Sequence, residues 1–98
     1  MPRYQARAEF RRLDRDRPWV LAGVVIQQRF WPVAPGVERV RGRLVANGLL
    51  GWIDLPTPIL APDIDTAAAT ALEMARAEWP KRVRTRVPHA SGTSEARR

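Results

Sequence analysis

Three arginines at alternate positions are the residues of this chain whose spacing best suits binding chemistry. Arg39, Arg41 and Arg43 would leave one face of a β-strand about 7 Å apart, because successive side chains of a strand point to opposite faces. With Trp52 beside them, such a face could bind phosphates and stack a nucleic-acid base. Arginine and tryptophan together are also typical of the residues that dominate protein interfaces. A third interpretation is a solvated face with an Arg43–Trp52 stack and an Arg41–Asp54 pair.

The distribution of reactive side chains excludes nucleophilic catalysis. The chain has no cysteine, and its only histidine and serines, His89, Ser91 and Ser94, lie close to the C-terminus. A hydroxyl or thiol nucleophile with a histidine base therefore cannot be assembled within residues 1–79.

Three carboxylates offer the remaining catalytic chemistry, which is a Mg²⁺ site. Asp63 and Asp65, together with Asp54, could supply oxygen ligands. We favour a structural interpretation, in which Asp63 or Asp65 caps a helix and Asp54 pairs with Arg41. No glycine-rich phosphate loop is present either. We therefore expect a protein that is not an enzyme and that holds no metal and no cofactor.

A hairpin centred on Asn47-Gly48 would position the arginine face. Asn-Gly between two apolar runs is typical of a two-residue turn, because both central residues must adopt a positive φ. The resulting register pairs residues 40–46 with residues 49–55, and it places Arg43 opposite Trp52. Leu50 lies on the same outer face as these residues. The uncharged face, which we expect to face the core, consists of Val40, Gly42, Leu44, Ala46, Leu49, Gly51, Ile53 and Leu55.

The remaining periodicities predict the rest of an α+β fold. Residues 4–10 alternate as a half-buried strand does, residues 19–31 form a second strand rich in β-branched residues, and residues 66–79 form a helix that ends before a proline. With the hairpin, this order predicts a four-stranded antiparallel β meander with one C-terminal helix packed on one face. We assign residues 1–80 to a single domain and residues 81–98 to a disordered, flexible basic tail.

Four tryptophans are many for 98 residues. Trp19 and Trp31 occupy odd positions of the second predicted strand, so both are expected on the outer side of the sheet, whereas Trp79 is expected in the core. With Leu50 and Trp52 they could form an exposed apolar patch, and such patches often mark a partner or a homodimer. The alternative is that the tail or a proline-containing loop folds over this patch.

The positive charge is concentrated at one end of the chain. The net charge is +7, and residues 80–98 account for +5 of it. The longest apolar run, residues 19–26, is far shorter than the roughly 20 residues of a membrane-spanning helix. A secretory signal is not expected, so we predict a cytoplasmic protein without a membrane partner.

One stretch of the chain is similar to a known family. Asp54-Leu55-Pro56, followed by Asp65-Thr66 at the start of an alanine-rich helix, resembles the HicB-type antitoxins. In that family a small sheet and one helix sequester a toxin partner, and the resemblance implies such an interaction here. It covers residues 50–78. Thr57 and Pro58 replace the usual glycine after the proline, and the spacing differs, so no residue roles are carried over.

These observations predict a small non-catalytic interaction protein, such as an inhibitor, an antitoxin-like protein or a phage-type regulator. It would dock on a protein partner, or on a second copy of itself, and would have no small-molecule substrate. The predicted contact residues are Arg39, Arg41, Arg43, Leu50, Trp52 and Trp31. The alternative is a nucleic-acid-binding protein that uses the same arginines with the tail. Its contact residues would be Arg39, Arg41, Arg43, Lys81, Arg82, Arg84 and Arg86.

Overall fold

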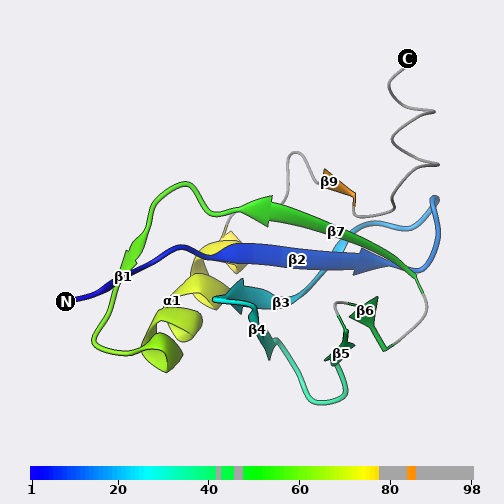
Figure 1. The fold of residues 1–98 in the computed structure, drawn as a ribbon. Helices are drawn as coiled ribbons and strands as arrows, with labels where there is room; N and C mark the ends of the chain where they lie inside the picture. The colour runs from blue at the N-terminus through cyan, green and yellow to red at the C-terminus, as the bar shows by residue number, and fades with distance from the viewer. Residues whose placement is uncertain (42, 46–47, 78–83, 86–98) are drawn as a thin grey trace.

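A five-stranded antiparallel sheet with one helix against it forms the body of the protein (Figure 1). The computed structural model describes residues 1–41, 43–45, 48–77 and 84–85 of the chain. The order of strands in the sheet is β4-β3-β2-β7-β9. Their bounds are β2 Arg7–Arg12, β3 Val20–Ile26, β4 Arg29–Pro32, β7 Leu49–Asp54 and β9 Arg84–Thr85. The predicted α+β class, with four antiparallel strands and one C-terminal helix, is confirmed.

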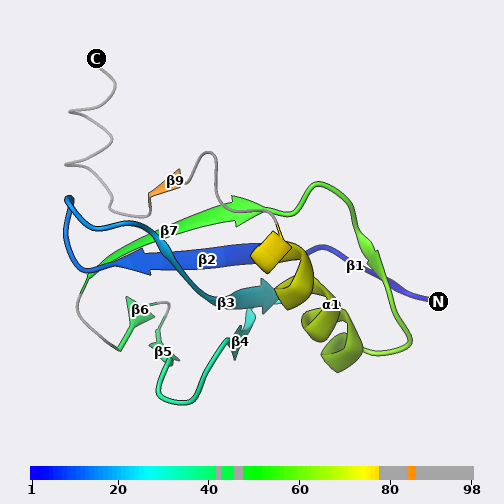
Figure 2. The ribbon, with the colours of Figure 1, turned by 180° about the vertical axis from the view of Figure 1, so that it is seen from behind.

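The core lies between the sheet and the helix α1 (Ile64–Ala77), which packs on the face formed by β2 and β3 (Figure 2). The central strand β2 turns Ala8 and Phe10 toward the helix, and each is 1% exposed. From β3, Val24 and Ile26 add to the same layer. Buried alanines let the helix approach the sheet closely, since they add little volume at the contact. These alanines are Ala67, Ala68, Ala71 and Ala75.

The start of α1 confirms the predicted cap. The backbone N–H of Thr66 donates to Asp63 Oδ1 at 2.7 Å, which satisfies one of the free amides of the first turn. This hydrogen bond lowers the pKa of Asp63. Asp65 has a different role, since its Oδ1 accepts a hydrogen bond from Trp31 Nε1 at 3.2 Å and so ties the helix to β4. The predicted core residue Trp79 lies outside the described residues.

The long strand predicted over residues 19–31 is divided into β3 and β4. A two-residue turn at Gln27 and Gln28 reverses the chain, and both residues have a positive φ, of 52° and 66°. The antiparallel pairing of the two strands then places Trp31 opposite Val24 and Phe30 opposite Val25.

The predicted pairing of residues 40–46 with residues 49–55 is wrong for the residues that the structure describes. β5 (Arg39–Val40) pairs with β6 (Arg43–Leu44) in a separate two-stranded hairpin, whereas β7 pairs with β2 on one side and with β9 on the other. Gly48 has a φ of +142°, and a Cβ on it would lie 2.5 Å from the carbonyl oxygen of Arg12. Glycine is therefore needed at this position where the chain passes the end of β2. Asn47 is outside the described residues.

The predicted faces of β7 are confirmed even though its neighbours are not. Ile53 pairs with Ala8 and packs against the core, and Gly51 pairs with Phe10. Leu50, Trp52 and Asp54, which alternate with these residues along β7, therefore lie on the face of the sheet opposite the helix. Pairing with β2 engages six residues on each strand, and it places Ile53 and Gly51 of β7 beside the core residues Ala8 and Phe10.

Two further short elements complete the description. β1 (Arg3–Tyr4) pairs with β8 (Ile59–Leu60), and β8 contacts α1. Ile59 is 5% exposed and belongs to the core, whereas Leu60 is 61% exposed. Arg84–Thr85, from the segment predicted as a tail, adds β9 beside β7. In the part of the chain that the structure describes, no helix has the length and apolar character needed to cross a membrane.

Candidate functional site

The face of the sheet opposite α1, here called the outer face, carries polar and aromatic side chains on its two middle strands. On β2 these are Arg7, Glu9 and Arg11, and on β7 they are Asp54, Trp52 and Leu50. They form three cross-strand pairs, Arg7 with Asp54, Glu9 with Trp52 and Arg11 with Leu50. Strand alternation places all six on the same side, because their neighbours along each strand belong to the helix side.

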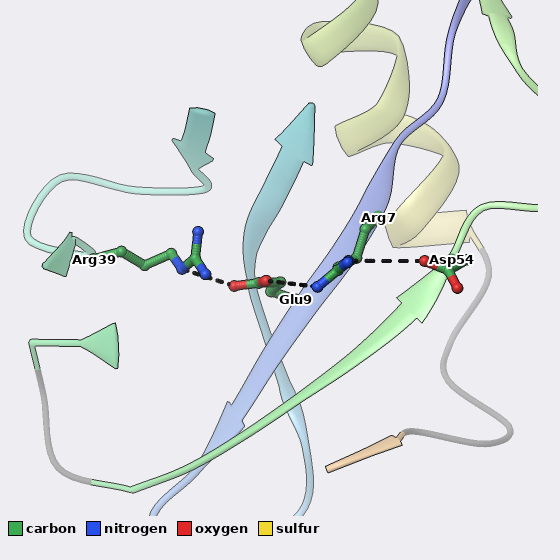
Figure 3. A network of polar contacts seen from close by, with 4 residues as sticks. All are labelled: Arg7, Glu9, Arg39 and Asp54. Carbon is green, nitrogen blue, oxygen red and sulfur yellow. Dashed lines mark ion pairs between the residues drawn. The ribbon is translucent and has the colours of Figure 1, made fainter. Parts of the chain in front are cut away.

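A buried carboxylate lies in the middle of the outer face. Glu9 has a fully buried side chain, with 0% exposure, and Arg39 Nε lies 3.0 Å from its Oε1. Arg7 Nη1 lies 4.0 Å from Oε2 of the same carboxylate. Figure 3 shows Arg39 extending from β5 toward Glu9, with Arg7 approaching from the other side. A carboxylate without water requires cationic partners of this kind, because its desolvation is costly.

The hairpin of β5 and β6 brings Arg39 to Glu9. The side chain of Arg39 is only 11% exposed, and its guanidinium lies over the ring of Phe30, 5.5 Å from the ring centroid. Phe30 in turn depends on Gly23, the residue paired with Glu9 on the neighbouring strand. A Cβ on Gly23 would lie 2.6 Å from the Phe30 ring and 2.3 Å from the carbonyl oxygen of Trp31. A glycine opposite Glu9 therefore makes room for the aromatic ring against which Arg39 packs.

Arg7 links the buried carboxylate to the exposed part of the outer face. Its Nε lies 3.7 Å from Asp54 Oδ1, and its guanidinium lies 5.4 Å from the centroid of the Trp52 ring. The side chain of Arg7 is 33% exposed, and Trp52 is partly exposed. An indole with an arginine over its ring is restricted in its rotation, so Trp52 presents a defined apolar surface.

The structure separates the three arginines that the sequence places on one strand. Arg39 lies on β5 and faces inward, Arg41 lies in the turn with a φ of 52°, and Arg43 lies on β6. The predicted outward direction of Arg39 is therefore wrong, because its guanidinium pairs with Glu9. Arg41 and Arg43 are exposed, and Arg43 pairs with Val40 rather than with Trp52.

The predicted aromatic and apolar contact residues also divide between the two faces. Leu50 and Trp52 lie on the outer face and are partly exposed, as predicted. The prediction that Trp31 and Trp19 face outward is wrong, since both pack against the core. Residues 19–31 form two strands rather than one, and the turn between them reverses which positions of β4 face the helix. Trp31 therefore shares the helix side with its partner Val24.

The predicted tail contributes little that the structure describes. Arg84 lies on β9, where it pairs with Trp52 of β7. Lys81, Arg82 and Arg86, the other tail residues of the predicted nucleic-acid surface, lie outside the described residues.

A groove opens at one end of the outer face, beside the turn of the β5–β6 hairpin. Its volume is about 670 Å³. Among the described residues, arginine and glutamine side chains dominate its lining, and Asp54 is the one carboxylate-bearing residue there. The described residues of the lining are Gln5, Ala6, Arg7, Val25, Gln27, Gln28, Arg39, Arg41 and Asp54. Gln5 also donates a hydrogen bond from Nε2 to the carbonyl oxygen of Leu55 at 3.0 Å.

The carboxylates considered as metal ligands have other contacts. Asp63 caps the helix, Asp65 binds the Trp31 indole, and Asp54 pairs with Arg7 rather than with Arg41. Among the residues that the structure describes, no three histidine, cysteine, aspartate or glutamate side chains gather into a possible metal site.

Arg7 and Glu9 are the residues of this site that the sequence analysis missed. In a strand that alternates apolar and polar residues, the polar positions were taken to face water. The sequence held no local signal for this burial, because residues 4–10 form the first strand of the predicted meander, and the structure instead makes β2 the central strand. Which residue would cover Glu9 could not be read from the sequence, because Arg39 lies 30 positions away.

Comparison of the chain with known protein families, with characterised proteins and with solved structures finds no match. The resemblance to the HicB-type antitoxins therefore receives no support from a family match. The geometry of the outer face is the basis for a functional proposal.

Proposed function

We propose that this chain is a small non-catalytic interaction protein that docks on an acidic surface of a partner protein through its outer face. The observation that carries the proposal is Trp52, a partly exposed indole in the middle of the sheet with the Arg7 guanidinium over its ring at 5.4 Å. Leu50, two residues earlier on β7, extends the apolar surface. Tryptophan and arginine are the residue types that most often dominate the energetics of protein interfaces.

The rigidity of β7 supports this assignment. β7 is hydrogen-bonded to β2 along six residues and to β9 on its other edge. A side chain held on a strand that is paired on both sides loses little freedom when it binds, which favours affinity. The contact surface is therefore ordered before a partner binds.

The charge of the outer face favours an acidic partner. The two carboxylates of the outer face, Glu9 and Asp54, are already paired with Arg39 and Arg7. Arg41 is exposed in the same groove as Asp54, Arg43 is exposed on β6, and the whole chain has a net charge of +7. An acidic protein surface complements this field and would associate faster than a neutral one.

A nucleic-acid partner is the competing proposal, and it is less well supported by the geometry. It relied on three arginines that project from one face, and Arg39 instead binds Glu9. Phosphate binding would show itself as a steep, log-linear loss of affinity with salt. An interface centred on Leu50 and Trp52 would show a shallower dependence, since much of its free energy comes from apolar contact.

The experiment is a comparative capture from a lysate of the source cells, followed by titration of the purified partner. Wild-type chain, Trp52→Ala and Leu60→Ala are used in parallel, because Leu60 is exposed apolar surface on β8, outside the outer face. We expect an acidic protein that Trp52→Ala fails to retain, with affinity reduced roughly thirtyfold or more, and that Leu60→Ala retains.

Three outcomes contradict the proposal. Equal binding by Trp52→Ala and the wild type would remove the outer face from the interface. Nucleic acid as the captured species, released log-linearly by salt, would replace the protein partner. Light scattering that shows a dimer, dissociated by Trp52→Ala, would replace the acidic partner with a second copy of this chain.

A further inference from the structure

Strained backbone and charged side chains coincide in the groove beside the β5–β6 hairpin. Within residues 1–41, 43–45, 48–77 and 84–85, the non-glycine residues with a positive φ are Gln27, Gln28 and Arg41, at 52°, 66° and 52°. All three line this one groove. They come from two different turns, so a single irregular loop does not explain the coincidence.

A positive φ is unfavourable for residues with a Cβ, because that atom approaches the carbonyl oxygen. Glycine or asparagine is the usual residue at such turn positions, since either tolerates this conformation at lower cost. Here the turns hold two glutamines and one arginine instead. Backbone strain of this kind is concentrated at ligand-binding sites in proteins, where the strained conformation holds a side chain in the position that binding requires.

The charges of the groove leave one arginine available. Arg39 pairs with Glu9, and Arg7 pairs with Glu9 and Asp54. Arg41 forms no ion pair with the residues that the structure describes, and its side chain is exposed at the groove. Among the described residues, three guanidinium groups of the lining thus meet two carboxylates, Asp54 in the lining and the buried Glu9, which leaves an excess of one positive charge.

We propose that the groove binds a ligand through a carboxylate group, with Arg41 as its charge partner. The guanidinium of arginine matches the two oxygens of a carboxylate, and the side-chain amides of Gln27 and Gln28 are further donors at the same groove. One carboxylate balances the excess charge of the site. The volume of about 670 Å³ is in the range of small-molecule sites, about 300–1,000 Å³. This proposal does not depend on protein docking at Trp52.

The test is an NMR titration of the ¹⁵N-labelled full chain at constant ionic strength. The probes are sodium succinate, a short peptide with a free C-terminal carboxylate, the same peptide amidated at its C-terminus, and inorganic phosphate. We expect saturable shifts centred on Gln27, Gln28 and Arg41 for a carboxylate probe, and none for the amidated peptide. Succinate and the free peptide distinguish a small acid from a chain terminus as the source of the carboxylate.

Two variants separate the groove from general electrostatics. Arg41→Gly removes the guanidinium while permitting the positive φ, so we expect an unchanged fold, a higher Tm and an affinity lower by about tenfold or more. Arg43→Ala removes the same charge on β6, outside the groove lining, and should change affinity by less than about twofold.

Several outcomes would overturn the inference. One is the absence of saturable shifts with both carboxylate probes. Equal losses in Arg41→Gly and Arg43→Ala would show that the probes respond only to net charge. Tighter binding of phosphate than of either carboxylate would also reject the assignment, because the site would then accommodate a second negative charge. The ¹⁵N spectrum of each variant shows directly whether its fold is retained, and Gln28→Gly provides a second test of the groove.

Discussion

Replacement of Arg39 by methionine should destabilise the protein more than any other arginine substitution on the β5–β6 hairpin. The substitution keeps the long apolar stem of the side chain but removes the charge that lies 3.0 Å from the buried carboxylate of Glu9. At an effective dielectric constant of about 20, a charge pair at this distance attracts by roughly 5.5 kcal/mol before desolvation is subtracted. Arg7, at 4.0 Å, remains and supplies roughly 4 kcal/mol on the same scale.

The expected loss of unfolding free energy is about 3 kcal/mol, at the lower end of the range for breaking a buried ion pair, because Arg7 still compensates part of the charge. For a domain of this size, that loss corresponds to a Tm lower by roughly 12–24 °C. The double variant Glu9→Leu with Arg39→Met removes both charges and should recover most of the loss, since apolar replacement of a buried pair is often neutral or stabilising. Urea denaturation and thermal unfolding of the full chain measure these quantities.

Arg43→Met is the matched control. It makes the same substitution on the exposed strand β6, and it should change stability by less than about 0.5 kcal/mol. The reasoning would be refuted if Arg39→Met cost less than about 1 kcal/mol, or if the double variant were no more stable than Arg39→Met alone. Either result would mean that Glu9 does not depend on the hairpin for its charge partner.

Two further predictions concern the supports of the site. Gly23→Ala should destabilise the fold by at least about 2 kcal/mol in urea denaturation, because the new methyl group would lie 2.3 Å from the Trp31 carbonyl oxygen. Gly36→Ala, which meets no atom within 4 Å, should show only the smaller effect of its positive φ, and equal effects would contradict this account. The lowered pKa of Asp63 means that its contribution to stability is complete above its ordinary pKa of 3.8 and is lost as the pH falls through its folded-state pKa. Urea midpoints between about pH 2 and pH 6 should therefore depend less on pH in Asp63→Ala than in the wild type, and equal dependence in the two proteins would contradict this account.

The side of the sheet that a residue occupies could be predicted from the sequence in β2 and β7. Alternation of period two places Ala8 and Phe10 on one face of a strand, whatever strand lies beside it. The same holds for Leu50 and Trp52, which lie on the outer face as predicted although the predicted neighbour of their strand is wrong. The cap of the helix was also predictable, because an Asp-side-chain acceptor before an apolar helical pattern is a local signal.

The neighbours of each strand could not be predicted. The alternation of apolar and polar residues shows which face of a strand is buried, and it is the same whichever strand lies beside it. The Asn47-Gly48 pair favoured a local hairpin, but Gly48 serves the close approach to Arg12 at the end of β2. Pairing of β7 with β2 rather than with residues 40–46 joins segments that lie far apart in the chain, so no local sequence pattern indicates it. In the same way, Gln27 and Gln28 form a turn that turn-residue preferences do not indicate, so the break in residues 19–31 was missed.

The position of Arg39 shows how this missing information changes a functional conclusion. In the sequence, Arg39 belongs to an evenly spaced set whose simplest function is to bind phosphates. In the structure, the change of partner for β7 frees residues 39–44 to form their own hairpin, and that hairpin places Arg39 against Glu9. Arg41 is then left in a strained turn at the groove, and Arg43 is left on the surface. Three residues of one type therefore have three different environments, and the basic character of the segment predicts the function of none of them individually. Of the three, only Arg39 has an ion pair with a carboxylate among the residues that the structure describes, so the competing functions are best separated by changing one arginine at a time.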